Sequence, residues 1–209
     1  MLDFNSVGLH PAQDVVSNSA LGAKTRGVYG IFFDRKELLL ERSGYLEFDN
    51  KLPMEVDDHH LLYIGASIDP LRRRVLTHLT GNSKGSSLRM TLGALLTEEL
   101  LLDPIAGPSR GYYDFGHGEA RLSEWIVRST RIGFYPSDDP YDLERHILQS
   151  VPLPLNIDQR KKHRFSRYLL MLRGYYSARP KQRGRLPVEW LRTPGTLPEA
   201  RVSGQEPQS

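Results

Sequence analysis

The chain has 209 residues, no cysteine and a formal net charge of +3. This length suits one domain with a tail. The absence of cysteine excludes disulfides, thiolate nucleophiles and zinc sites built on cysteine. No apolar run approaches the roughly 18 residues of a membrane span, and the N-terminus lacks the pattern of a secretory signal. These features together predict a cytoplasmic protein.

Positive charge gathers toward the C-terminal end of the chain. Residues 160–185 include ten basic side chains and no acidic one. A stripe of this kind attracts polyanions, and phosphate backbones in particular. On its own, the stripe is explained equally well as a solvated, poorly ordered end of the chain.

Composition divides the chain into three parts. Residues 1–24 are polar and weakly patterned, so we expect a loose leader. Residues 25–176 carry the hydrophobic patterning of a folded domain. Residues 177–209 contain five prolines, three glycines and few apolar side chains, so we expect a disordered tail.

Short apolar and amphipathic segments alternate within the central part, which predicts an α/β domain. Strands are indicated by short apolar runs, and helices by a 3.6-residue apolar period after a serine or an Asp-Pro start. In an Asp-Pro start the aspartate is expected to be the N-cap and the proline the first helical residue. Strands are expected at 27–33, 61–66 and 131–135, with a possible hairpin within 37–48. Helices are expected from Asp69-Pro70 to about 79, at about 88–100, at 119–129, from Asp139-Pro140 to about 150, and at about 165–172.

The remaining segments are expected to be less regular. Residues 103–118 are predicted as loop or irregular strand. Residues 151–157 (VPLPLNI) must be extended, because their prolines disfavour helix.

Two of the predicted strands present a tyrosine, and the helix after the second adds basic side chains. Tyr29 lies in Gly-Val-Tyr and Tyr63 in Tyr-Ile-Gly. In the helix that follows, Arg74 and His78 lie one turn apart on the same flank. Both can face the end of the strand that carries Tyr63, although the helix register leaves Arg73 as an alternative to Arg74.

This order of motifs resembles the GIY-YIG nuclease superfamily, in a bacterial single-domain branch. Residues 81–96 (GNSKGSSLRMTLGALL) and 118–125 (GEARLSEW) resemble the same branch. The resemblance implies a small, mostly antiparallel sheet of about three strands flanked by helices. The two tyrosines stand 34 positions apart (63 minus 29), farther than in most members, so we expect an inserted hairpin between adjacent strands.

The resemblance also implies a set of catalytic residues. They are Tyr29, Tyr63, Arg74, His78, Glu144 and Asn156. Glu144 would hold one divalent cation, Mg²⁺ or Mn²⁺, while Asn156 would orient Glu144 or a bound water. Arg74 would clamp phosphate, and one tyrosine would deprotonate the attacking water. Family analogy favours Tyr29 for that role.

Further residues are expected to hold the nucleic acid. Ser86, Ser87 and Arg89 open a predicted helix whose free N–H groups could bind phosphate, although simple capping by serine explains them equally well. The basic stripe contributes Arg160, Lys161, Lys162 and Arg164.

The sequence therefore predicts a metal-dependent endonuclease, acting on DNA rather than RNA. Two other functions remain open. One is a nucleic-acid-binding module of the same fold without catalysis. The other is a phosphoesterase that acts on a small nucleotide, against which the basic stripe argues.

Overall fold

Three long antiparallel strands form the centre of the computed structural model, which describes residues 8–34, 54–107, 111–151, 153–160 and 163–178. β2 (Gly27–Asp34) lies between β4 (His59–Ser67) and β7 (Thr130–Pro136). Two-residue strands pair at the edges, β1 (His10–Pro11) with β7 and β3 (Glu55–Val56) with β4. The sheet order is β1-β7-β2-β4-β3. The predicted antiparallel sheet is confirmed, with five strands in place of about three.

The two strands that carry Tyr29 and Tyr63 are far apart in the sequence but adjacent in the sheet. β2 and β4 are direct neighbours, with Tyr29 opposite Gly65 and Ile31 opposite Tyr63. The chain between them includes β3 and residues 35–53. The hairpin predicted at 37–48 lies outside the described residues.

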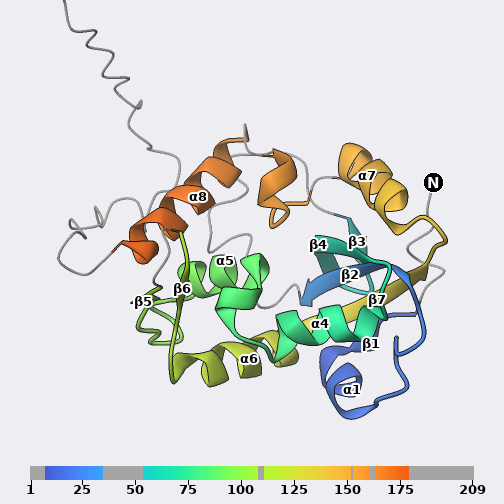
Figure 1. The fold of residues 1–209 in the computed structure, drawn as a ribbon, viewed down its shortest axis with the longest axis horizontal. Helices are drawn as coiled ribbons and strands as arrows, with labels where there is room; N and C mark the ends of the chain where they lie inside the picture. The colour runs from blue at the N-terminus through green and yellow to red at the C-terminus, as the bar shows by residue number, and fades with distance from the viewer. Residues whose placement is uncertain (1–7, 35–53, 108–110, 152, 161–162, 179–209) are drawn as a thin grey trace, which may run out of the picture.

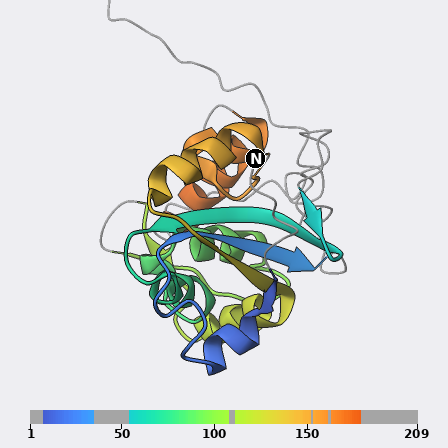
Figure 2. The same cartoon turned by 90° about the vertical axis from the view of Figure 1, so that its right-hand side faces the viewer.

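Helices cover both faces of the sheet, as Figure 2 shows with α7 above the strands and α1, α4 and α6 below them. Because strand side chains alternate, Tyr29, Ile31 and Phe33 face the larger core cluster. Val28 and Phe32 face the smaller cluster, which includes Ile147. β2 is therefore apolar on both faces, which explains its uninterrupted hydrophobic sequence.

The remaining elements follow the predicted order with shifted boundaries (Figure 1). They are α4 (Leu71–Leu79), η3 (Ser83–Gly85), α5 (Ser87–Leu95), β5 (Ile105–Ala106), β6 (Tyr113–Asp114), α6 (Gly118–Ser129), α7 (Pro140–Ser150), η4 (Ile157–Arg160) and α8 (Arg164–Ser177). β5 and β6 form a separate two-stranded sheet.

The two Asp-Pro helix starts behave differently. At α7, Asp139 is the N-cap and its carboxylate accepts a hydrogen bond from the Asp142 amide, as predicted. At α4 the N-cap position falls on Pro70, and no side chain caps the helix. The expectation that Asp69 caps α4 is wrong.

The N-terminal region does not match the loose leader that we expected. Residues 12–17 form α1 (Ala12–Ser17), and Ala12 and Val15 are fully buried. α1 contacts α4 and α6. Two apolar residues on one face of a short polar helix are enough to attach it to the domain, although they give little signal in the sequence.

No helix in the described part of the chain is both long and apolar enough to cross a membrane. At the C-terminal end, α8 extends to Ser177, beyond the predicted end near residue 172. The tail predicted from residue 177 falls almost wholly outside the described residues, because 179–209 are not described.

Candidate active site

The two tyrosines lie on the same face of the sheet, against α4. Their ring centroids are 6.4 Å apart, and the His78 ring lies 5.7 Å from that of Tyr29 and 5.3 Å from that of Tyr63. The antiparallel register causes this, because Tyr29 and Tyr63 occupy diagonal positions of adjacent strands. The i, i+4 spacing of Arg74 and His78 brings both side chains of α4 to the pair.

A continuous hydrogen-bond network runs from α5 to the tyrosines. Ser86 Oγ lies 2.7 Å from His78 Nδ1, and His78 Nε2 lies 2.7 Å from Tyr29 Oη. Ser86 Oγ also accepts the Arg89 amide N–H. Among the described residues, the only acceptor for the Ser86 hydroxyl hydrogen is His78 Nδ1. This assigns the tautomer in which Nε2–H donates to Tyr29.

The network continues from Tyr29 to Tyr63. Burial is the largest cause that raises the pKa of each phenol, and the pKa of Tyr29 is raised well above its usual value. The hydrogen bond between the two phenols raises the pKa of Tyr29 and lowers that of Tyr63. The two phenols are therefore coupled through this bond, and a negative charge on Tyr63 also raises the pKa of Tyr29.

His78 is neutral within this network. Burial, followed by the positive charges of Arg74 and Arg89, lowers the pKa of its imidazole to about 3. The imidazole can thus donate through one nitrogen and accept through the other near neutral pH.

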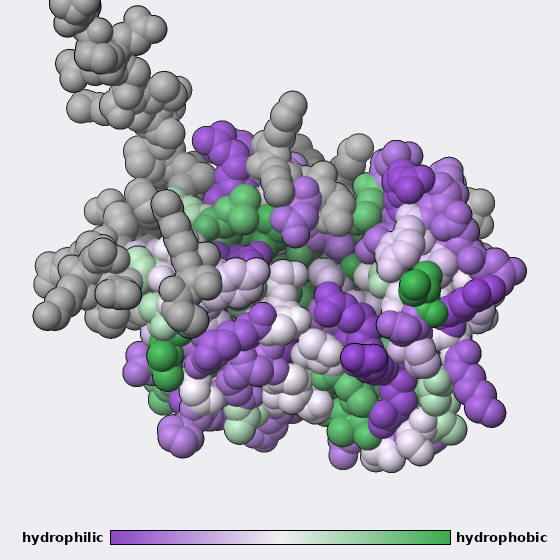
Figure 3. All heavy atoms as spheres, in the orientation of Figure 1, coloured by the Kyte–Doolittle hydropathy of each residue, from purple (hydrophilic) through white to green (hydrophobic). Residues whose placement is uncertain are grey.

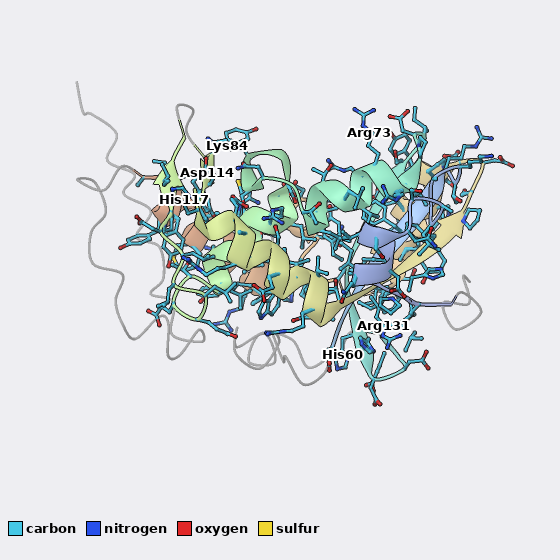
Figure 4. The ribbon with its side chains drawn as sticks, turned by 90° about the horizontal axis from the view of Figure 1, so that it is seen from below. His60, Arg73, Lys84, Asp114, His117 and Arg131 are labelled. Atoms are coloured by element: carbon cyan, nitrogen blue, oxygen red, sulfur yellow. The ribbon has the colours of Figure 1, made fainter. Side chains whose placement is uncertain are left out.

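Arg74, rather than Arg73, lies at the tyrosine pair. Its charge lowers the pKa of both phenols, and it also hydrogen bonds to Tyr29. The Arg74 side chain is otherwise exposed, so it can reach a substrate. Arg73 projects from the outer side of α4 (Figure 4), where it lines a separate pocket with Pro70 and Leu76.

Glu144 and Asn156 line a cavity together with Tyr63. This cavity of about 60 Å³ is lined by Tyr63, Ser87, Thr91, Glu144, Leu155, Asn156, Ile157, Asp158 and Arg173. These residues come from β4, α5, α7, α8 and the segment before α8. The cavity has room for a few water molecules, and it brings residues from distant parts of the sequence together.

Glu144 fits a single cation. Burial raises the pKa of its carboxyl group, and a hydrogen bond from the Ala66 backbone offsets only part of that rise. Glu144 has no ion-pair partner within the described part of the chain, so its half-buried charge lacks compensation. One carboxylate, with space for water and phosphate oxygen, is the donor set that Mg²⁺ or Mn²⁺ accepts. No cluster of three or more histidine, aspartate or glutamate side chains forms among the described residues.

We expected Asn156 to orient Glu144 or a bound water, but its side chain hydrogen bonds to the backbone of β4. Its Oδ1 accepts the Ile64 amide N–H at 3.0 Å, and its Nδ2 donates to the Ile64 carbonyl at 2.9 Å. The Leu155 amide donates to the Leu62 carbonyl. These bonds extend the edge of β4 beyond β3 and fix the backbone on both sides of Tyr63. Asn156 is therefore bonded to the strand that carries Tyr63, directly beside that residue.

Two residues assigned to phosphate binding are internal. Arg89 is fully buried, and its Nη2 forms an ion pair with Glu119 Oε2 at 2.6 Å. Its Nη1 donates to the carbonyls of His78 and Leu79. Ser86 is buried as the N-cap of α5. Expecting these two side chains to contact nucleic acid was wrong, because both are buried within the fold.

The other residues that we predicted to bind nucleic acid lie in different parts of the structure. Ser87 lines the cavity with Glu144. Arg164 is exposed in the first turn of α8. The side chains of Arg160, Lys161 and Lys162 lie outside the described residues. Hydrophilic side chains also gather over α4 (Figure 3), the helix that carries Arg72, Arg73 and Arg74.

Sequence reasoning missed Ser86 as the partner of His78, and it missed Thr91, Asp158 and Arg173 as cavity residues. Asp158 could have been noticed, since it stands two positions after Asn156. The others depend on long-range packing that no local pattern reports.

The comparison with family models agrees with this architecture. The model of the GIY-YIG catalytic domain matches residues 27–175, and the chain belongs to this family. The domain is thus of a nuclease type that cleaves DNA. No curated protein and no solved structure matches the chain significantly.

The Tyr29 ring lies directly across Gly65. A Cβ at position 65 would lie 2.3 Å from Tyr29 Oη. Gly65→Ala should therefore displace Tyr29 from His78 and lower the unfolding free energy by about 1–3 kcal/mol. Gly174→Ala on α8, where a Cβ meets nothing within 4 Å, is the matched control and should leave stability equal or slightly higher. Equal denaturation curves for both variants would contradict the close contact.

Protonation of His78 should weaken the fold at acidic pH. The lowered pKa means that the folded state keeps His78 neutral while the unfolded state binds a proton below about pH 6.5. Stability from this group is complete above pH 6.5 and is lost as pH falls toward 3. Between pH 6.5 and 5 the loss is about 2 kcal/mol.

Urea denaturation of the wild type and of His78→Gln at pH 7 and pH 5 measures this effect. The variant should show the smaller difference between the two pH values. His146→Gln, which removes an exposed histidine of α7, should retain the wild-type difference. An unchanged difference in His78→Gln would show that His78 is already charged or exposed.

Proposed function

We propose that this protein hydrolyses phosphodiester bonds in DNA with one divalent cation, Mg²⁺ or Mn²⁺, held by Glu144. The observation that carries the proposal is the common cavity of Tyr63 and Glu144, backed by the network through Tyr29 and His78. A bound divalent cation would supply Lewis acidity toward the phosphate and positive charge beside the Tyr63 phenol.

Tyr63, rather than Tyr29, is the better general base in this arrangement. Tyr63 lines the cavity with Glu144, whereas Tyr29 is 1% exposed and bonded to His78. The charge of Arg74 and the hydrogen bond with Tyr29 both lower the pKa of Tyr63, against the rise that burial causes. The base assignment that family analogy favoured therefore moves from Tyr29 to Tyr63.

The reaction then uses each side chain in a defined way. The Tyr63 phenolate takes a proton from a water molecule, and the water oxygen attacks phosphorus. The bond from phosphorus to the leaving sugar oxygen breaks, and that oxygen takes a proton from solvent. Arg74 binds the phosphate oxygens, whose negative charge grows during the attack. Tyr29 and His78 remain neutral and hold Tyr63 in position.

One assay tests the activity itself. Purified protein is incubated with supercoiled plasmid, single-stranded DNA and RNA, each with Mg²⁺, Mn²⁺ or EDTA. Cleavage of DNA that EDTA abolishes supports the proposal. Retained binding without cleavage under any condition would instead support the non-catalytic module.

Replacing the metal carboxylate should abolish cutting and spare binding. Glu144→Gln removes the charge and should lower the cleavage rate by about 10³-fold or more, because metal catalysis is worth several kcal/mol. Asp142→Asn, on the same helix and exposed beside Arg145, is the matched control and should cut normally. Normal cleavage by Glu144→Gln would place the metal elsewhere.

A further inference from the structure

Arg173 lies at the active-site cavity but belongs to α8, a helix that none of the proposed catalytic steps uses. α8 lies across α5 (Figure 1), and the two helices are in contact. Arg173 lines the cavity together with Tyr63, Glu144 and Asp158. It thus approaches the reacting region from a different helix than Arg74.

The guanidinium of Arg173 lacks a carboxylate partner among the described residues. Its hydrogen-bond contact there is with Met90 Sδ, 4.0 Å from Nη2, and thioether sulfur is a weak acceptor. Its charge also opposes the rise in the pKa of Tyr113 that burial causes. By contrast, Arg89, Arg26 and Arg145 each pair with a carboxylate.

A partly buried, uncompensated cation is unfavourable unless an anion joins it. Among the described residues, no ion pair joins Arg173 to the carboxylates of its cavity, where the negative charge of Glu144 would repel an anionic substrate. The guanidinium offsets that repulsion. It can also bind phosphate through two parallel hydrogen bonds.

We propose that Arg173 is a second phosphate-binding residue, which contacts a phosphate oxygen of the DNA at the cavity while Arg74 holds the scissile group from α4. This inference rests on the proposed nuclease function. It explains why a charged side chain is placed between α5 and α8, where Met90 and Tyr113 supply no counter-charge.

A purely structural role for Arg173 makes a different prediction. In that case the aliphatic part of the side chain would attach α8 to α5 through Met90. Arg173→Met keeps a long apolar side chain and removes the charge. Arg173→Lys keeps the charge but loses the guanidinium group that can form two parallel hydrogen bonds with phosphate. The two variants therefore separate packing from phosphate binding.

The experiment measures two properties of the full-length protein and its variants. The first is kcat/KM for plasmid cleavage in Mg²⁺. The second is the binding of a fluorescein-labelled DNA duplex in EDTA over a series of salt concentrations. Arg145→Met, which removes an exposed arginine of α7, is the matched control, and thermal melting monitors the fold.

Arg173→Met should lose about 10²-fold in kcat/KM, and its salt dependence should fall by about one unit of slope because one phosphate contact is gone. Arg173→Lys should recover part of both, and Arg145→Met should behave as wild type. Wild-type cleavage and salt slope in Arg173→Met would overturn the proposal. So would equal losses in both Arg173 variants together with a lowered melting temperature.

The experiment tests the nuclease function and the phosphate-binding role of Arg173 separately. Failure of the wild type to cut any substrate overturns the nuclease mechanism, while the salt slope in EDTA still tests the phosphate contact of Arg173. A wild type that cuts, with an Arg173→Met variant that cuts equally well, overturns only the role of Arg173.

Discussion

The hydrogen bond between Tyr29 and His78 joins the sheet to α4, and the candidate active site depends on it. It forms because Gly65 leaves space for the Tyr29 ring, and because Ser86 fixes the imidazole from the other side. Neither partner is charged, so the contact has no ion-pair energy that salt could screen. Its value lies in positioning, since it holds the Tyr29 ring beside those of Tyr63 and His78.

The buried ion pair of Arg89 and Glu119 supports this arrangement from outside the site. Arg89 holds the last carbonyls of α4, and its amide fixes Ser86. Glu119 also accepts hydrogen bonds from the Ser83 and Phe115 amides. Breaking one side of such a pair leaves an uncompensated buried charge. The position of His78 therefore depends on α5 and α6 as well as on α4.

Local periodicity was sufficient to predict much of the site. The spacing of Arg74 and His78 follows from helical geometry, and the N-cap at Asp139 identified the helix that carries Glu144. The central strands were predicted because β2 is buried on both faces. Sequence reasoning failed where a long-range partner decides the role of a residue. Arg89 reads as a surface cation until Glu119 is seen beside it, and Asn156 reads as a metal-site residue until its bonds to Ile64 are known.

The central claim is that Tyr63 removes the proton from water while Tyr29 positions it. Single-turnover cleavage rates of Tyr63→Phe and Tyr29→Phe, measured between pH 6 and pH 9.5, test this claim most directly. The account predicts that Tyr63→Phe loses the rise of rate with pH almost completely. Tyr29→Phe should keep a rising profile at lower rates, since the hydrogen bond that lowers the pKa of Tyr63 has been removed. A Tyr63→Phe variant with the wild-type profile, together with an inactive Tyr29→Phe, would contradict the account.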